Sequence, residues 1–323
     1  MIRTKHLRRS SNVLVLNLAI SDMVITMQSP IVIVNSFWNG PVLGDIGCQI
    51  YGFVGGLAGT TSIISLAILA FNRYRVISKP FDLERKSTQI KSMFQIVFIW
   101  FYSLCFASLP LFGISRYVPE GYLTSCSFEY LTDNVKNRIF ILAFFLGAWC
   151  VPCFIILFSY INIVSVVHRS KFKISENVAD NLDRRKLEIQ ITKTAFGLIT
   201  TWMIAWTPYA IVVLLGISHN KEYITPFSSM LCGTFCKISA CSNPFLYALT
   251  YPPMKKEITK IFNNFCLSGK SDVGHLALTR RKISDTDSDI SDSFPGGYKA
   301  GFSQYITNKD TNETHLVNDT KIC

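Results

Sequence analysis

One lysine lies inside an otherwise uncharged, apolar stretch, FCKISACSNPFLYA (residues 235–248). A charged side chain at the middle of a bilayer costs about 2.5–3.5 kcal/mol even on lenient insertion scales. A buried amine of this kind is therefore a candidate functional residue, and Lys237 is the first that the sequence offers. What chemistry it serves depends on the residues and helices that surround it.

Other polar or helix-bending residues also interrupt apolar stretches. Intramembrane polar groups are functional candidates by default, and each proline removes a backbone hydrogen bond and bends its helix. Taken singly, each has a structural interpretation, such as a core tryptophan or a tolerated kink. The set comprises Asp22 in LNLAISD, Asn72, Arg73 and Tyr74 in NRY, Pro152 and Tyr160, Trp206 and Pro208 in AWTPYA, and Asn243, Pro244 and Tyr247 in NPFLY.

The elements that position these residues are long apolar runs. The chain of 323 residues is 49% hydrophobic and 16% charged, and runs of roughly 20 apolar residues mark membrane-spanning helices. Six occur, at 13–37, 48–71, 92–114, 139–167, 194–218 and 223–250. Soluble helices of this length would need a charged face. The sequence therefore predicts an all-α transmembrane helical bundle.

The net charge of +11 is distributed in a way that argues against nucleic-acid binding. Basic residues gather in alternate loops, within 3–9, 73–91, 169–186 and 255–260, whereas the intervening loops are nearly balanced. This positive-inside pattern predicts a multi-pass protein of the cell membrane with both the N-terminus and the C-terminus in the cytosol. Basic loops beside the lipid bilayer are then solvated and face anionic lipid.

The composition also divides the chain. Residues 1–12 are polar and basic, 13–250 form the bundle, 251–266 read as an amphipathic membrane-surface helix, and 267–323, rich in Ser, Asp, Lys, Gly and Thr, read as a disordered cytosolic tail. Of the ten cysteines, only Cys48 and Cys126 fall at non-cytosolic loop ends, where oxidising conditions allow a disulfide. Free thiols at these two positions are the alternative.

In this order, the motifs resemble those of the rhodopsin-like G-protein-coupled receptors. The resemblance runs from about Lys5 to Cys266 and rests on LNLAISD, a cysteine 25 residues before the arginine of NRY, the lone Trp100, WTP and NPFLY. The family has seven helices. The resemblance implies that the first is absent here and that residues 1–12 correspond to the first cytosolic loop.

Within that family, Lys237 resembles the retinal-binding lysine of opsins, because it lies seven residues, or two helical turns, before Pro244. The resemblance implies 11-cis retinal bound covalently as a Schiff base, which needs an amine held in a dry pocket. SRYVPEGYLTSC (115–126) resembles the second extracellular loop of opsins, and Glu120 in it is the implied counterion. An exposed loop acid is the alternative. Tyr51 and CSFEYLTD (126–133) point to the arthropod-like rhabdomeric group.

Family position also implies the rest of the retinal pocket. Tyr51, Trp206 and Tyr209 would face the ligand, with Gly55, Gly56, Gly59 and Thr60 on the opposite wall. Small residues leave room for a long flat ligand there. Close helix packing through small side chains is the alternative.

The resemblance assigns the cytosolic residues to an activation switch. Ligand isomerisation would strain Trp206 and the bend at Pro208 and shift the bundle between two packings. Arg73 is the expected latch, with Asn72 in place of the usual acid and Glu188 available across the bundle. In the active state, the expected partners of Arg73 are the hydroxyl groups of Tyr160 and Tyr247. The full set is Asp22, Asn72, Arg73, Tyr74, Tyr160, Glu188, Pro208, Asn243, Pro244 and Tyr247.

The implied partners are a heterotrimeric G protein, of the Gq class by analogy with rhabdomeric opsins, and arrestin and a receptor kinase acting on the tail. Cys266 is a candidate palmitoylation site, with an ordinary thiol as the alternative. The protein is expected to be a receptor, not an enzyme. A retinal photoisomerase and a non-signalling truncated fragment remain open. An amine receptor would need an acid where Gly55 lies, and a peptide or lipid receptor would leave Lys237 and Glu120 unexplained.

Overall fold

The computed structural model describes residues 10–78, 89–132, 134–171, 179–218, 221–250, 255 and 259–260. The chain divides into two units, Met1–Thr259 and Lys260–Cys323, and every element named below belongs to the first. In chain order these elements are α1 (Ser10–Met27), α2 (Ser29–Trp38), α3 (Gly44–Ser78), α4 (Gln89–Ser108), β1 (Tyr117–Glu120), β2 (Ser125–Phe128), α5 (Val135–Phe145), α6 (Val151–Lys171), α7 (Ala179–Ile217) and α8 (Pro226–Thr250).

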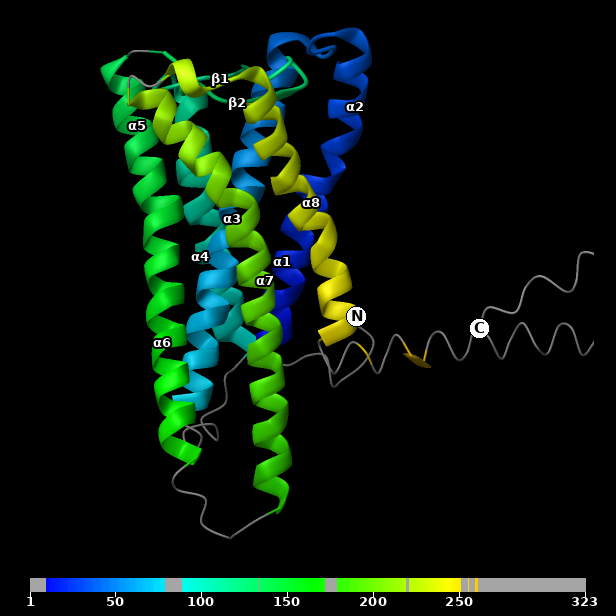
Figure 1. Ribbon diagram of the computed structural model, residues 1–323, viewed down its shortest axis with the longest axis vertical. Helices are drawn as coiled ribbons and strands as arrows, with labels where there is room; N and C mark the ends of the chain where they lie inside the picture. Colours follow the sequence, from blue (N-terminus) through cyan, green and yellow to red (C-terminus); the bar gives the residue numbers. More distant parts are fainter. Residues whose placement is uncertain are drawn as a thin grey trace, which may run out of the picture. The chain divides into compact units, whose positions relative to one another are not determined.

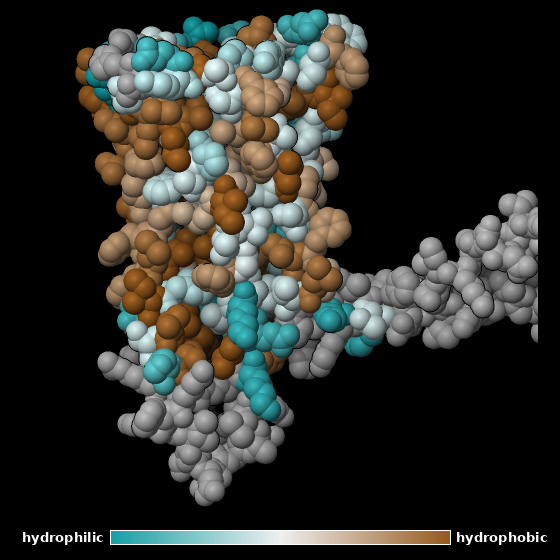
Figure 2. All heavy atoms as spheres, in the orientation of Figure 1, coloured by the Kyte–Doolittle hydropathy of each residue, from teal (hydrophilic) through white to brown (hydrophobic). Residues whose placement is uncertain are grey.

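The predicted helical membrane bundle is confirmed. Among the described residues, five segments are long and apolar enough to cross a membrane: Val13–Trp38, Gly44–Ser78, Ile90–Phe112, Val135–His168 and Lys186–Ile217. The sixth predicted run forms α8, which falls outside this set because it carries Lys237, Asn243 and several serines and threonines. Figure 2 shows apolar side chains along the helices and polar ones gathered toward their ends.

Several spans carry an irregular turn or an internal proline. α1 gives way to α2 at Gln28, and Pro30 lies in the first turn of α2, where its missing N–H costs nothing. A π-helical turn, Leu146–Cys150, joins α5 to α6 just before the buried Pro152. Pro208 and Pro244 lie inside α7 and α8, as predicted. α7 begins fifteen residues before its apolar run, because charged residues extend it beyond the bilayer-like part.

α3 lies at the centre of the bundle and packs against α1, α4, α6 and α7 (Figure 1). Its middle third is almost entirely buried, and Leu66 and Ala70 are fully enclosed. A polar link crosses this core, because the Trp100 indole N–H donates to Asn17 Oδ1 at 2.8 Å and the Asn17 amide donates to Ser65 at 2.9 Å. These contacts fix α1, α3 and α4 together, and α7 and α8 pack alongside.

β1 and β2 form an antiparallel hairpin that lies across the helix ends near α2 and α5 (Figure 1). Tyr117 pairs with Phe128 and Glu120 with Ser125 in the register of the strands. Gly121 follows β1 with a positive φ of 62° and its Cα faces Met230 and Pro226 of α8, so a side chain there would be strained. The hairpin is thereby held against α8.

Some predictions concern residues beyond the described ones. Most of the predicted surface helix at 251–266, with Cys266, and the whole predicted tail at 267–323 lie outside them. So do most of residues 1–12, although α1 already begins at Ser10.

Candidate functional site

Lys237 and Glu120 reach one pocket from different elements. Lys237 projects from the middle of α8, and Glu120 ends β1, in the hairpin above it. Both line a cavity among α1, α3, α5, α7, α8 and the hairpin. Tyr51, which is 7% exposed, lies beside the amine, with its ring centroid 5.8 Å from Lys237 Nζ.

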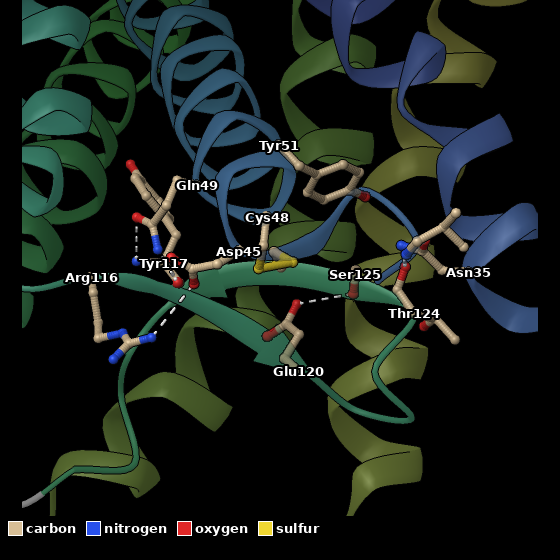
Figure 3. Close-up of a disulfide and its surroundings, with 12 residues drawn as sticks. Asn35, Asp45, Cys48, Gln49, Tyr51, Arg116, Tyr117, Glu120, Thr124 and Ser125 are labelled. Carbon is tan, nitrogen blue, oxygen red and sulfur yellow. Dashed lines mark hydrogen bonds and ion pairs between the residues drawn. A yellow bond between two sulfur atoms is a disulfide. The ribbon is translucent and has the colours of Figure 1, made fainter. Parts of the chain in front are cut away.

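Four hydroxyl groups lie within hydrogen-bonding distance of the Glu120 carboxylate. Tyr209 of α7 donates to Oε2 at 3.2 Å. The hydroxyl oxygens of Tyr130 and of Ser229 in α8, which also bond each other, lie 3.3 and 3.4 Å from the same atom. Ser125 donates to Oε1 at 3.4 Å, an interaction visible in Figure 3. Burial raises the pKa of Glu120, and the Lys237 charge and the hydroxyl groups of Tyr209, Tyr130 and Ser229 oppose that rise. The ionised form of Glu120 is therefore stabilised in this buried site only by the cation and the hydrogen-bond donors that face it.

The rest of the pocket is aromatic and apolar. Trp206 stacks on Trp202 with ring centroids 5.1 Å apart and planes at 7°. Both indoles line the cavity, which extends from Lys237 to Phe144, Phe145 and Trp149 near the π-helical turn. The arrangement suits a long, flat, apolar ligand with a reactive group at the lysine end.

The glycines of α3 allow neighbouring side chains to pack closely against the helix, in addition to leaving room for a ligand. A Cβ on Gly59 would lie 2.6 Å from Trp206 Cη2, so only glycine admits the indole at this distance. A Cβ on Gly55 would meet Gln28 Oε1 at 3.1 Å, and one on Gly56 would meet the Tyr117 hydroxyl at 3.3 Å. The wall is thus close-packed as well as ligand-facing. Thr60 also lines the cavity and donates to the Gly56 carbonyl at 2.8 Å.

The predicted disulfide is present and joins the hairpin to α3. Cys48 and Cys126 are both buried, with Cα atoms 5.5 Å apart (Figure 3). Next to it, the Gln49 amide donates to the Tyr117 carbonyl at 2.7 Å. Burial raises the pKa of Tyr117, whose phenol donates to the Ala107 carbonyl at 2.8 Å. Glu120 is therefore fixed on a strand that is itself anchored twice.

At the end of the bundle away from the hairpin, Arg73 and Glu188 form an ion pair. Arg73 Nη1 donates to Glu188 Oε2 at 2.9 Å, and the two side chains are 2% and 12% exposed. The pair joins α3 to α7 across the bundle. The neighbouring Asn72 exchanges two hydrogen bonds with Gln95 of α4, at 3.1 and 3.3 Å.

The remaining switch candidates are spread over three helices. The Tyr160 phenol donates to the Thr192 carbonyl at 3.3 Å, and Tyr74 packs edge-on against Phe158 with centroids 5.7 Å apart. The Tyr247 hydroxyl is buried and has no hydrogen-bond partner among the described residues. It lines a small cavity that Arg73 also lines. In this conformation the Tyr160 phenol therefore bonds α7, and the Tyr247 hydroxyl lies in the cavity beside Arg73 without a hydrogen bond to a described residue.

Asp22 and Asn243 meet in the middle of the bundle. The Asn243 amide donates to Asp22 Oδ2 at 2.7 Å, and Ser62 donates to Oδ1 at 3.4 Å. The link joins α1, α3 and α8 just before Pro244. Asp22 is 3% exposed and Asn243 2% exposed, so the contact is sheltered from solvent.

Sequence reasoning missed several residues of the site, and four polar ones among them are Tyr130, Ser229, Ser127 and Gln95. Ser127 bonds the Tyr209 hydroxyl, and the others bond Glu120 or Asn72 as described. Tyr130 and Ser127 belong to the loop segment that carried the resemblance, so that segment was a signal for them. Ser229 and Gln95 have no comparable signal, because a lone polar residue in a span does not reveal its partner.

Comparisons with known proteins agree with this arrangement. The family model for the 7 transmembrane receptor (rhodopsin family) matches residues 1–247. The ultraviolet-sensitive opsin of Apis mellifera is 38% identical over 267 residues, which cover 79% of this chain and 71% of that protein. Opsin Rh4 of Drosophila melanogaster is 37% identical over 268 residues, covering 80% and 70%. The crystal structure of squid rhodopsin aligns with a TM-score of 0.74 at 30% identity, covering 81% of this chain and 77% of that one.

The fold and the family match define a multi-pass membrane receptor of the rhodopsin class, which acts through a heterotrimeric G protein. Within that class, the chain belongs to the opsins, in the arthropod-like rhabdomeric group. It is accordingly a light-sensing receptor and not an enzyme.

Proposed function

We propose that the receptor senses light through 11-cis retinal attached to Lys237 as a Schiff base, with Glu120 as the counterion. The observation that carries the proposal is the convergence of one amine and one carboxylate on a single aromatic-lined pocket. The buried Tyr51 hydroxyl lines this pocket and has no hydrogen-bond partner among the described residues. A polyene aldehyde suits this site, because the lining is largely apolar and aromatic and Lys237 supplies the amine.

Retinal, when bound, supplies the light absorption and the change of shape. The chain's residues hold it and respond to it. Tyr51 and the hairpin cover the amine, Glu120 balances its positive charge, and Trp206 packs between the pocket and α3. Because Gly59 seats the Trp206 ring against α3, a change in pocket shape bears on α7 at the Pro208 bend.

At the cytosolic end, this change of packing would act on the contact between α3 and α7. In the present packing Arg73 is held by Glu188 of α7, and outward movement of α7 would break that pair and free the cytosolic crevice. We place the Gq class of G proteins there, arrestin and a receptor kinase on the C-terminal tail, and both termini in the cytosol. The positive-inside charge pattern supports this orientation.

The test is light-dependent nucleotide exchange on Gq by purified receptor supplied with 11-cis retinal. The proposal expects exchange in light and little in the dark, and no light response in Lys237→Ala. Pigment formation without any G-protein exchange would favour a retinal photoisomerase. The Arg73–Glu188 pair favours the receptor, because it joins helices that a photoisomerase need not separate.

A further inference from the structure

Tyr130 and Ser229 form a buried hydroxyl pair against Glu120. Tyr130 follows β2 and is 4% exposed, and Ser229 lies in the first turn of α8 and is 2% exposed. Their oxygens are 2.7 Å apart, and each also lies within 3.4 Å of Glu120 Oε2. The pair therefore connects the segment after β2, α8 and the carboxylate at one point.

The two hydroxyl protons limit which hydrogen bonds Tyr130, Ser229 and Glu120 can make at the same time. Each hydroxyl has one proton to donate, so the two groups cannot make their mutual bond and also both donate to Glu120. The shortest contact is the mutual one, and the Tyr130 contact with Oε2 is slightly shorter than that of Ser229. The arrangement that uses both protons best has Ser229 donating to Tyr130 and Tyr130 donating to Glu120.

The Tyr130 ring is fixed by packing as well. A Cβ on Gly216 of α7 would lie 2.6 Å from Tyr130 Cδ2 and 2.7 Å from its carbonyl oxygen, so glycine lets the tyrosine lie against that helix. Phe128 meets the ring edge-on with centroids 6.4 Å apart. The backbone N–H of Ser229 donates to the Thr225 carbonyl at 3.2 Å. Donor and acceptor are therefore both held before any ligand binds.

We propose that Tyr130 and Ser229 are positioning residues that keep Glu120 an ionised carboxylate facing Lys237, with Ser229 acting through the Tyr130 hydroxyl. This inference rests on the proposed counterion role. Burial and the Glu120 charge raise the pKa of Tyr130, which keeps the phenol protonated and able to donate. The other charged or titratable groups facing the carboxylate are Lys237, Tyr209, Tyr51, Cys232 and Cys236.

The first test uses the pigment. Purified receptor with 11-cis retinal is titrated upward in pH, and the pH at which the visible band disappears is recorded. Removing a donor from the carboxylate weakens its support for the cation, so Tyr130→Phe should lower this midpoint by about one pH unit. Ser229→Ala should lower it by less, and the double variant should match Tyr130→Phe alone, because one residue acts through the other.

Matched controls are Tyr122→Phe, an exposed tyrosine in the turn between β1 and β2, and Ser242→Ala, whose hydroxyl donates to the Ser239 carbonyl far along α8. Both should leave the midpoint unchanged. Equal midpoints for Tyr130→Phe and its control, or fully additive effects of the two changes, would overturn the proposal. If the unaltered receptor forms no pigment, the proposed function fails, and a second test still decides this inference.

That second test needs no ligand. Burial raises the pKa of Glu120, so the folded apoprotein binds a proton more tightly there than the unfolded chain and loses stability as pH rises. Tyr130→Phe raises the pKa of Glu120 further. Its melting temperature should therefore fall by about 2–4 °C more at about pH 8 than at about pH 5. In a Glu120→Gln background this pH-dependent difference should vanish, and its persistence there would refute the pairing.

Discussion

The Arg73–Glu188 ion pair predicts the receptor's activity in the dark. Changing Glu188→Gln keeps the shape of the side chain but removes the charge that faces Arg73, which is 2% exposed. A hydrogen bond to a charged group contributes about 1.5–3 kcal/mol. In the proposed mechanism the pair exists in the packing seen here and is lost when α7 moves outward, so this amount separates the two states.

The magnitude follows directly. Each 1.4 kcal/mol is a factor of ten in an equilibrium constant. Glu188→Gln should therefore raise the population of the active packing, relative to the packing seen here, roughly 10- to 150-fold. From a starting population of about 0.1%, that raises the dark active fraction to roughly 1–15%. Only the latched state loses stability, because Arg73 is left buried beside an uncharged amide.

The assay is nucleotide exchange on purified Gq in complete darkness, with receptor amounts matched by antibody. Glu222→Gln is the matched control, an exposed acid of the short turn Lys221–Tyr223 at the other end of α7. Glu188→Gln should raise dark exchange severalfold or more above Glu222→Gln. Equal dark rates in the two variants, with equal responses to light, would refute the latch.

Three further predictions concern the disulfide, the packing of Trp206 and the activity in the dark. Cys48→Ser breaks the bond to Cys126 and should cost about 2–4 kcal/mol in the free energy of unfolding, seen as a lower melting temperature; reductant should then have no further effect on that variant. Gly59→Ala places a methyl against Trp206 and should cost about 1–3 kcal/mol, whereas an unchanged melt would show that the indole moves freely. Asn72→Asp should lower dark exchange by restoring an acid beside the arginine, and an unchanged basal rate would count against this reasoning.

Sequence patterns predicted the helical bundle well because bilayer thickness constrains each span separately. Apolar length and proline positions are local properties, and they placed Pro208 and Pro244 inside helices as found. Helix ends were less predictable. α7 extends into charged sequence back to Ala179, where neither polarity nor proline stops a helix.

The site was predictable only where spacing encodes geometry. Lys237 and Glu120 were found from motif positions, and the Cys48–Cys126 bond from their places in the loops. The Tyr130–Ser229 pair could not be found in this way, because the two residues are 99 positions apart and meet only when the hairpin folds onto α8. The role of Gly59 was likewise visible only once Trp206 was in place.

The most direct measurement is the site of covalent attachment. Receptor supplied with 11-cis retinal in the dark is reduced with borohydride, digested and mapped by mass spectrometry. A retinyl group on Lys237, with no visible band in Lys237→Ala, is the predicted result. A retinyl group on another lysine, or a visible band that survives in Lys237→Ala, would contradict the account.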